Sequence, residues 1–208
     1  SSDNTNNIIL NYRDGITHHV SEPDNGLYDA MNKGIAIAKG DIIGILNSDD
    51  IFHDNTVLES VAAFHNRHAI EASISDVLYK NNKGKIVRKY SAKSWSPEKM
   101  KSAFMPPHAG IFFKKDLFKD IGNYKLDYII AADFELISRF FVTNKIIWKY
   151  LNINTTIMSI GGISSSGLKS YRIISKEIGK ALASNKIKYS YLKIQLRLFN
   201  KLLGLFKI

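Results

Sequence analysis

Two adjacent carboxylates follow a short apolar segment in the first quarter of the chain. Residues 42–46 are mostly apolar, and they lead directly into the polar sequence Asn47-Ser48-Asp49-Asp50. A short apolar run bounded by turn-forming residues predicts a buried strand, and in open α/β sheets ligands bind beyond the carboxyl ends of the strands. Crowded carboxylates are unfavourable unless a cation offsets their charge, and Mg²⁺ is commonly held by carboxylates together with substrate phosphates. Residues 47–50 therefore predict a site for a divalent metal and a diphosphate.

Turn formation is the alternative role for these two aspartates. An Asp at the end of a strand often forms an Asx turn or caps the helix that follows it. Asp54 already provides a cap for the helix expected from about residue 55 to 68, so Asp49 and Asp50 are not required for capping. Taken alone, the pair leaves both roles open.

Composition narrows the class of protein. The chain has 208 residues, is 45% hydrophobic and contains no cysteine, which predicts one domain with a sizeable core and excludes thiolate chemistry. The absence of cysteine also fits a reducing compartment, so we expect a cytoplasmic protein. The net charge of +10 is concentrated in residues 169–208, which hold ten basic residues and one acid, whereas residues 1–168 hold 19 basic and 18 acidic residues. A nearly neutral body disfavours a nucleic-acid partner.

The hydrophobic periodicity predicts an α/β fold that would position the acidic pair. Helices are expected at residues 27–39, 55–68 and 131–144, and strands at 42–46, 72–79, 85–91, 109–113, 146–151 and 154–160. The alternation of strand and helix in the first half predicts a mostly parallel sheet sandwiched by helices, and a hairpin in the middle makes the sheet mixed. We expect one domain over residues 1–166 and a basic amphipathic helical extension over residues 167–208.

Two segments of the sequence carry a family resemblance. The first comprises residues 21–34, SEPDNGLYDAMNKG, and residues 40–50, GDIIGILNSDD; the second comprises residues 122–136, in which GNY is followed by AADFEL. Together they resemble the family 2 glycosyltransferases, especially the branch that builds bacterial surface polysaccharides such as colanic acid, capsule and O-antigen. The resemblance extends from residue 1 to about residue 166. It implies a GT-A fold and an inverting transfer from a nucleotide-sugar donor to a saccharide or lipid-linked saccharide acceptor, assisted by Mg²⁺ or Mn²⁺.

The resemblance also assigns roles to individual side chains. The acidic metal-binding motif corresponds to Asn47, Asp49 and Asp50. Of these, Asp49 and Asp50 are the expected metal ligands, with Asp50 the direct one, while Asn47 and Asp49 also face the donor. The helix that flanks the donor diphosphate corresponds to Asp29, Asn32 and Lys33. For Lys33 an ordinary solvated lysine is an equal alternative.

Asp133 matches the position of the catalytic base in this family. A carboxylate can take the proton of an acceptor hydroxyl during its attack, and the alternative role of Asp133 is to cap the helix that it begins. Glu135 is expected to support this segment. For His108 a contact with the acceptor is the lesser of two readings, since a histidine in a loop is more often structural. Residues 161–167 are rich in Gly and Ser, which fits either a loop that closes over the donor or an inert linker.

Two features leave other functions open. The family begins with a strand, a helix and a second strand, and here residues 1–5 resemble the turn that follows them, so this unit is expected to be missing. A truncated, non-catalytic remnant is therefore the alternative to an enzyme.

In the tail, an apolar stripe runs through Ile187, Tyr191, Ile194, Leu198, Leu202 and Leu205. A basic amphipathic helix predicts binding to the inner face of the cell membrane, to a polyanion or to a partner, or packing on the protein's own core.

Overall fold

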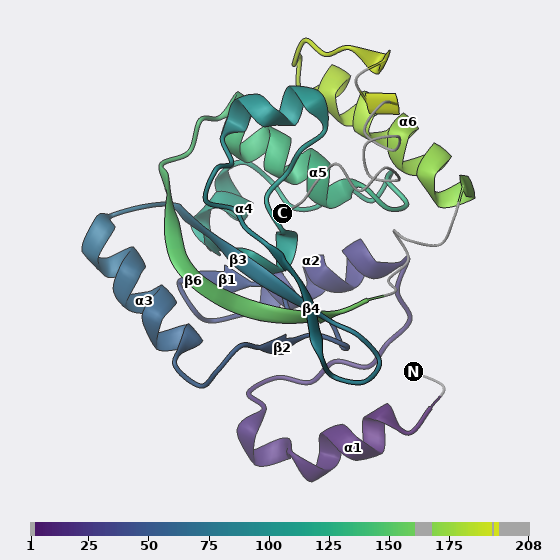
Figure 1. Ribbon diagram of the computed structural model, residues 1–208. Coiled ribbons are helices and arrows are strands. Elements are labelled where there is room, and N and C mark those ends of the chain that lie inside the picture. Colours follow the sequence, from purple (N-terminus) through teal and green to yellow (C-terminus); the bar gives the residue numbers. More distant parts are fainter. Residues whose placement is uncertain (1–2, 161–167, 193, 196–208) are drawn as a thin grey trace.

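The computed structural model describes residues 3–160, 168–192 and 194–195, and within them one mixed sheet is flanked by helices (Figure 1). The strands are β1 (Ile42–Gly44), β2 (Ile51–Phe52), β3 (Ala72–Lys80), β4 (Ile86–Tyr90), β5 (Ile111–Lys114) and β6 (Trp148–Ser159). The order across the sheet is β1-β5-β3-β6-β2, and β4 pairs with β3. The predicted mixed α/β architecture is therefore confirmed.

The helices expected at residues 27–39, 55–68 and 131–144 correspond to helical segments of the structure. The α-helices are α1 (Thr5–Asn11), α2 (Leu27–Ile37), α3 (Val57–His68), α4 (Asp116–Asp120), α5 (Ala132–Ile137) and α6 (Leu168–Ser184). A π-helical segment, Ser138–Thr143, continues α5, and short 3₁₀ turns lie at Arg13–Gly15, Pro97–Ser102 and His108–Gly110.

The prediction that the sheet is mostly parallel is wrong. Among the described strands only β3 and β6 run parallel, with Tyr79 opposite Met158, whereas β1–β5, β3–β5, β3–β4 and β2–β6 are antiparallel. The alternation of strand and helix in the first half suggested neighbouring parallel strands. Instead β1 and β2 are short and lie at opposite edges of the sheet, each beside a strand from the second half of the chain.

The two faces of the sheet bury separate hydrophobic clusters. Because side chains alternate along a strand, Phe113 of β5 faces the larger cluster, which is covered by α2, α4, α5 and α6, while Phe112 faces a smaller cluster beneath α3. Figure 1 shows α3 on one side of the sheet and α5 on the other. Rings cross edge to face in the larger cluster, such as Trp95 against Phe141 at 5.2 Å between centroids.

Helix α6, the first part of the predicted extension, packs on the domain. Its residues Ile178, Ala181 and Leu182 belong to the larger cluster. Two residues of the predicted tail stripe, Ile187 and Ile194, are buried in the same cluster, whereas Tyr191 is 54% exposed. The stripe residues Leu198, Leu202 and Leu205, and the loop of residues 161–167, lie outside the described residues. Among the described helices, none has the length and apolar character needed to cross a membrane.

Candidate functional site

The Asn47–Asp50 turn connects β1 to β2 and is closed by its own hydrogen bonds. The amide nitrogen of Asp50 donates to the carbonyl of Asn47 over 3.1 Å, and the Asn47 side-chain amide donates to Asp50 Oδ2 over 3.1 Å. The hydroxyl of Ser159, at the end of β6, donates to the carbonyl of Asp49 over 3.1 Å. These bonds turn Asp50 inward and leave the Asp49 side chain at the surface.

The Asp50 carboxylate is buried without a compensating charge. The residue is 5% exposed, and its Oδ1 atom accepts no hydrogen bond from the described residues. Nor does any ion pair within the described part of the chain include Asp50. Burial, reinforced by the nearby charge of Asp49, raises the pKa of Asp50, while the hydrogen bond from Asn47 opposes this shift. An unpaired buried carboxylate is unfavourable, and a bound cation would relieve it.

The available ligands fit a metal that shares its coordination with a phosphate. Within the described residues no group of three or more His, Cys, Asp or Glu side chains is arranged to hold a metal ion. Asp50 therefore offers one buried oxygen, with Asp49 beside it, and these could be only part of a coordination shell. Mg²⁺ and similar cations are commonly bound in this way, with water and substrate phosphates completing the shell.

The turn lies at the carboxyl end of the parallel strand pair. Lys80, the last residue of β3, is opposite Ser159, the last residue of β6. Tyr79 is close enough to Asp50 that burial and the Asp50 charge together raise the pKa of its hydroxyl, and the Arg88 guanidinium counteracts this. Arg88 lies 5.5 Å above the ring of Tyr79. This is the sheet edge at which a ligand is expected.

Asp133 lies in the first turn of α5 and is partly buried. The N-cap residue of this helix is Ala131, so Asp133 does not begin the helix as the capping alternative assumed. Its Oδ1 atom nevertheless accepts the amide hydrogen of Phe134 over 2.7 Å. Because the first amides of a helix lack intrahelical partners, this bond stabilises the first turn and fixes the carboxylate with respect to it.

The charge of Asp133 affects the pKa of three ring side chains. Burial, together with the Asp133 charge, raises the pKa of both Tyr28 and Tyr124. Burial lowers the pKa of His108, and the Asp133 charge opposes that shift. The rings of Tyr28 and Tyr124 stack at 5.7 Å, and His108 Nε2 lies 2.7 Å from the Tyr124 hydroxyl. The sequence singled out His108 but assigned no role to either tyrosine, although Tyr28 and Tyr124 lie within the segments that carry the family resemblance.

The α2 residues expected at the donor diphosphate make contacts within the protein. The side chain of Asn32 donates to the carbonyl of Tyr124 over 2.8 Å and accepts from its amide over 3.0 Å. Lys33 Nζ lies 2.8 Å from a Glu22 carboxylate oxygen and 3.3 Å from Asp29 Oδ2. These contacts attach α2 to Tyr124 and to the turn that precedes the helix. The donor contacts of Asp29, Asn32 and Lys33 remain predictions.

Two buried carboxylates form ion pairs that were not predicted from the sequence: Asp76 was not singled out, and Glu135 was expected only to support its segment. Asp76 of β3 is 1% exposed and pairs with Lys89 over 2.7 Å, and it also accepts the Tyr150 hydroxyl. Glu135 is fully buried and pairs with Arg139 over 3.0 Å and with Lys125 over 2.8 Å. In both cases bonds to these partners lower the pKa of the carboxyl, against the effect of burial. Both carboxylates are paired and stay ionised, so their role is to stabilise the packing of the segments that they join.

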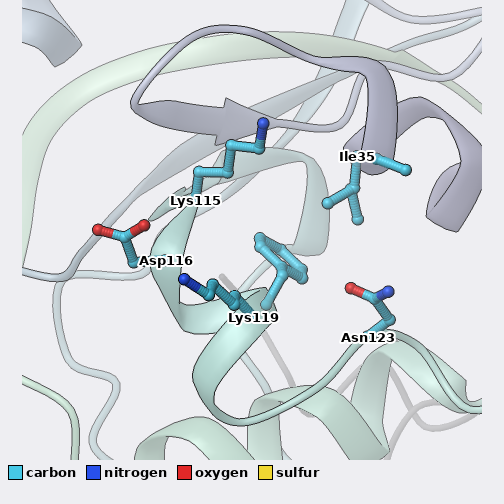
Figure 2. A pocket seen from close by; sticks show the side chains of 7 residues that line it. Ile35, Lys115, Asp116, Lys119 and Asn123 are labelled. Atoms are coloured by element: carbon cyan, nitrogen blue, oxygen red, sulfur yellow. The ribbon is translucent and has the colours of Figure 1, made fainter.

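A shallow pocket of about 380 Å³ lies between the end of α2 and α4 (Figure 2). Its lining comprises Ile35, Ala36, Lys115, Asp116, Phe118, Lys119 and Asn123. The Lys115 ammonium donates to the carbonyl of Ala38, near the end of α2. None of the predicted site residues lines this pocket, so it is not the site described above.

Comparison with solved structures places the fold among GT-A-like glycosyltransferases. A crystal structure of Staphylococcus aureus TarS 1-349 matches with a TM-score of 0.67 at 17% identity, covering 100% of this chain and 63% of that chain. The mannosyltransferase from Pyrobaculum calidifontis in complex with GDP-Man and Mn²⁺ matches with a TM-score of 0.56 at 13% identity, covering 100% of this chain and 69% of that chain. At these identities the likeness establishes the fold alone.

The chain belongs to glycosyl transferase family 2, whose sequence profile matches residues 1–122. A PGL/p-HBAD biosynthesis glycosyltransferase of Mycobacterium bovis is 28% identical over 166 residues, which is 77% of this chain and 59% of the relative. An uncharacterized glycosyltransferase of Mycobacterium tuberculosis is 34% identical over 130 residues, 60% of this chain and 48% of the relative. The chain thus spans about half to three fifths of these curated relatives.

Proposed function

We propose that this protein transfers a sugar, with inversion, from a nucleotide-diphosphate donor to a hydroxyl of a saccharide or lipid-linked saccharide in bacterial surface polysaccharide synthesis. The observation that carries the proposal is the buried Asp50 carboxylate with its unpartnered Oδ1, at the sheet edge where β3 and β6 end. Membership in glycosyl transferase family 2 supports the reaction class. A TarS structure in complex with UDP, similar in fold, supports a nucleotide donor.

Asp50 and Asp49 would hold the divalent metal, Mg²⁺ or Mn²⁺. Bound there, the metal would supply positive charge to the departing diphosphate. The protein's own part is to keep Asp50 ionised and oriented, and Asn47 serves both purposes through its bond to Asp50 Oδ2. A complex of a GT-A-like mannosyltransferase with Mn²⁺ supports this choice of cation.

Asp133 is proposed as the base that takes the proton of the acceptor hydroxyl. A carboxylate in hydrogen-bond reach of that hydroxyl contributes roughly 10²–10⁴-fold to the rate. The charge of Asp133 acts on the buried side chains of Tyr28, Tyr124 and His108, and an ionised carboxylate beside groups that can hold or donate protons supports this role. Its bond to the Phe134 amide holds it in one orientation.

Calorimetric titration with UDP and GDP, each with and without Mn²⁺, tests the donor and metal site. We expect binding of one nucleotide to require the metal and to be lost in Asp50→Asn, which keeps the shape of the side chain but removes its charge. The matched control is Asp120→Asn, an exposed carboxylate at the end of α4, which should bind like the wild type. Equal affinity in Asp50→Asn and the wild type would refute the metal site.

We also propose a peripheral position at the inner face of the membrane through the segment after α6. Tyr189, Tyr191 and Leu192 are 39%, 54% and 67% exposed, next to the exposed Lys186 and Lys188. Exposed apolar side chains beside lysines suit an anionic lipid surface. Tyr191→Ser combined with Leu192→Ser should reduce cosedimentation with phosphatidylglycerol vesicles, while Leu58→Ser on α3 should not. Equal sedimentation of both variants would reject the proposal.

A further inference from the structure

The carboxylate of Glu177 receives three consecutive backbone amides from a distant loop. Glu177 lies on α6, is 7% exposed and is the one acidic residue after residue 168. Its Oε1 atom accepts the amide of Ile129 over 2.6 Å, and its Oε2 atom accepts the amides of Ile130 and Ala131, each over 2.9 Å. Bonds to an ionised acceptor are shorter and stronger than neutral ones. One side chain therefore fixes the backbone of this segment.

The segment of residues 127–131, here called the 127–131 loop, leads directly into α5. It lies outside the helices and strands, so its amides have no partners in regular secondary structure. Ala131 is the N-cap of α5, and Asp133 follows two residues later. The position of the Asp133 carboxylate is thus set by the end of a loop whose amides are bonded to α6.

Further contacts hold the same loop from two sides. On α6, one turn beyond Glu177, Lys180 Nζ donates to Asp127 Oδ2 over 2.6 Å and lies 4.3 Å from the centre of the Tyr128 ring. On α2, the Tyr28 hydroxyl donates to the carbonyl of Ile130. The residue Ile130 is therefore bonded through its amide to α6 and through its carbonyl to α2.

We propose that Glu177 is a positioning residue for Asp133, acting through the 127–131 loop. The inference rests on the proposed function of Asp133 as the base. Glu177 acts through the three loop amides that it accepts, and we assign it no direct part in the proton transfer. By holding three amides it fixes the start of α5, and thereby the direction from which the Asp133 carboxylate approaches an acceptor hydroxyl. Through Glu177, α6 helps to position the proposed base, although its sequence lies in the predicted extension.

Amide hydrogen exchange of the full chain tests the contact without requiring activity. In Glu177→Gln the side-chain amide can no longer accept from all three N–H groups, so exchange at residues 129–131 should accelerate by about tenfold or more. Exchange in α3, on the other face of the sheet, should not change. The matched control is Lys176→Gln, the exposed neighbour on the same helix, which should leave the loop protected. Unchanged exchange at residues 129–131 in Glu177→Gln would overturn the proposal.

Kinetics then test whether the loop positions the base. The wild type is first assayed with a panel of UDP- and GDP-sugars, and the donor that gives the fastest release of nucleoside diphosphate is chosen. With that donor, Glu177→Gln should lower kcat by about tenfold, which corresponds to about 1.4 kcal/mol in the activation free energy. The KM for the donor and the calorimetric stoichiometry of Mn²⁺-dependent nucleotide binding should stay at wild-type values, because the Asn47–Asp50 turn is not altered. Unchanged stoichiometry rules out a loss of folded protein as the cause of the lower kcat.

A second variant acts on the same residue, Ile130, through its carbonyl. Tyr28→Phe keeps the stacked ring but releases the carbonyl of Ile130, and it should also lower kcat without raising the donor KM. A faster-exchanging loop with unchanged kcat in both variants would overturn the proposal. Full turnover by Asp133→Asn would instead refute the base, while the exchange rates at residues 129–131 would still decide whether Glu177 holds the loop.

Discussion

Asn47 donates its side-chain amide to Asp50 Oδ2 over 3.1 Å, and this bond leaves the second oxygen of the same carboxylate buried and unpartnered among the described residues. One oxygen is thus fixed and the other is available. A metal ligand needs this combination, because the carboxylate must be both oriented and free to coordinate. The unfavourable burial of its charge is the reason to expect opposite effects of substitution on stability and on binding.

Asp50→Asn should stabilise the protein in the absence of metal while abolishing metal-dependent nucleotide binding. Because burial raises the pKa of Asp50, the ionised form destabilises the fold at neutral pH, and removal of its charge should raise the free energy of unfolding. Urea denaturation at pH 7 with a chelator measures this change. A clear loss of stability would indicate that the Asp50 charge has a partner within the protein.

Asp133→Asn should keep donor binding and lose sugar transfer. The substitution preserves the bond from the Phe134 amide but removes the basic oxygen, so turnover should fall by roughly 10²–10⁴-fold. Nucleoside diphosphate release and calorimetry with Mn²⁺ measure the two properties separately. Turnover comparable to that of the exposed control Asp120→Asn would refute the assignment of the base.

The same variant should change the titration of His108. The Asp133 charge raises the pKa of His108 against the effect of burial, so Asp133→Asn should shift the pKa of His108 further downward. Carbon and nitrogen chemical shifts of the imidazole, followed by NMR as a function of pH, measure this directly. An unchanged titration of His108 would show that the two side chains are not coupled.

Stability should fall in mild acid because of His65. This residue is buried on α3 with Nε2 3.0 Å from the Ser73 hydroxyl, and burial, aided by the Lys114 charge, lowers its pKa from 6.5 to about 4. Between pH 4 and pH 6.5, His65 is protonated in the unfolded chain but neutral in the folded protein. The free energy of unfolding is therefore not reduced by His65 above pH 6.5. It falls as the pH is lowered toward 4, by up to about 3 kcal/mol.

Unfolding at a series of pH values compares the wild type with two histidine variants. His65→Gln can keep the bond to Ser73 but does not titrate, so its stability should depend less on pH between 4 and 6.5. His18→Gln, in an exposed loop, should retain the slope of the wild type. Identical slopes in His65→Gln and the wild type would remove His65 as the cause.

Arg139 should be essential for stability because it compensates Glu135. Arg139→Met would leave the fully buried Glu135 with Lys125 as its remaining charged partner, beside the side-chain amide of Asn185, and breaking a buried pair costs about 3–5 kcal/mol. Replacing both, as Glu135→Leu with Arg139→Met, should recover much of this loss. Glu22→Gln, at an exposed pair with Lys33, should cost less than about 1 kcal/mol. Thermal unfolding measures all three, and a mild effect of Arg139→Met would contradict the ion network.

Local sequence patterns predicted the elements well and their pairing poorly. The apolar runs located β1, β3 and β5, and the helical periodicity located α2, α3 and α5. Strand direction was not predictable, because the pairing of Ile43 with Phe113 joins segments that are seventy residues apart in the sequence. The two strands expected at residues 146–151 and 154–160 form the single strand β6, and the register of its pairing with β3 shifts where they join, between Ile74 and Val77 of β3.

In the candidate site, too, the local features were predictable from the sequence and the contacts between distant segments were not. The acidic turn at Asn47–Asp50 is local, so the sequence identified it, and the structure adds that Asp50 rather than Asp49 is buried. The surroundings of Asp133 depend on contacts between distant segments: Tyr124 is held by Asn32, and Ala131 by Glu177. No spacing or periodicity indicates such bonds. Sequence reasoning therefore selected the reactive groups and missed the residues that orient them.

The small cluster beneath α3 offers a place to engineer robustness. Val57, Val61, Phe112 and Leu151 form a compact unit that contains neither Asp50 nor Asp133. Volume-conserving changes in such a unit are tolerated when its total size is kept. Directed evolution for expression or heat resistance can therefore concentrate on the buried positions of α3, away from the side chains of Asp50 and Asp133.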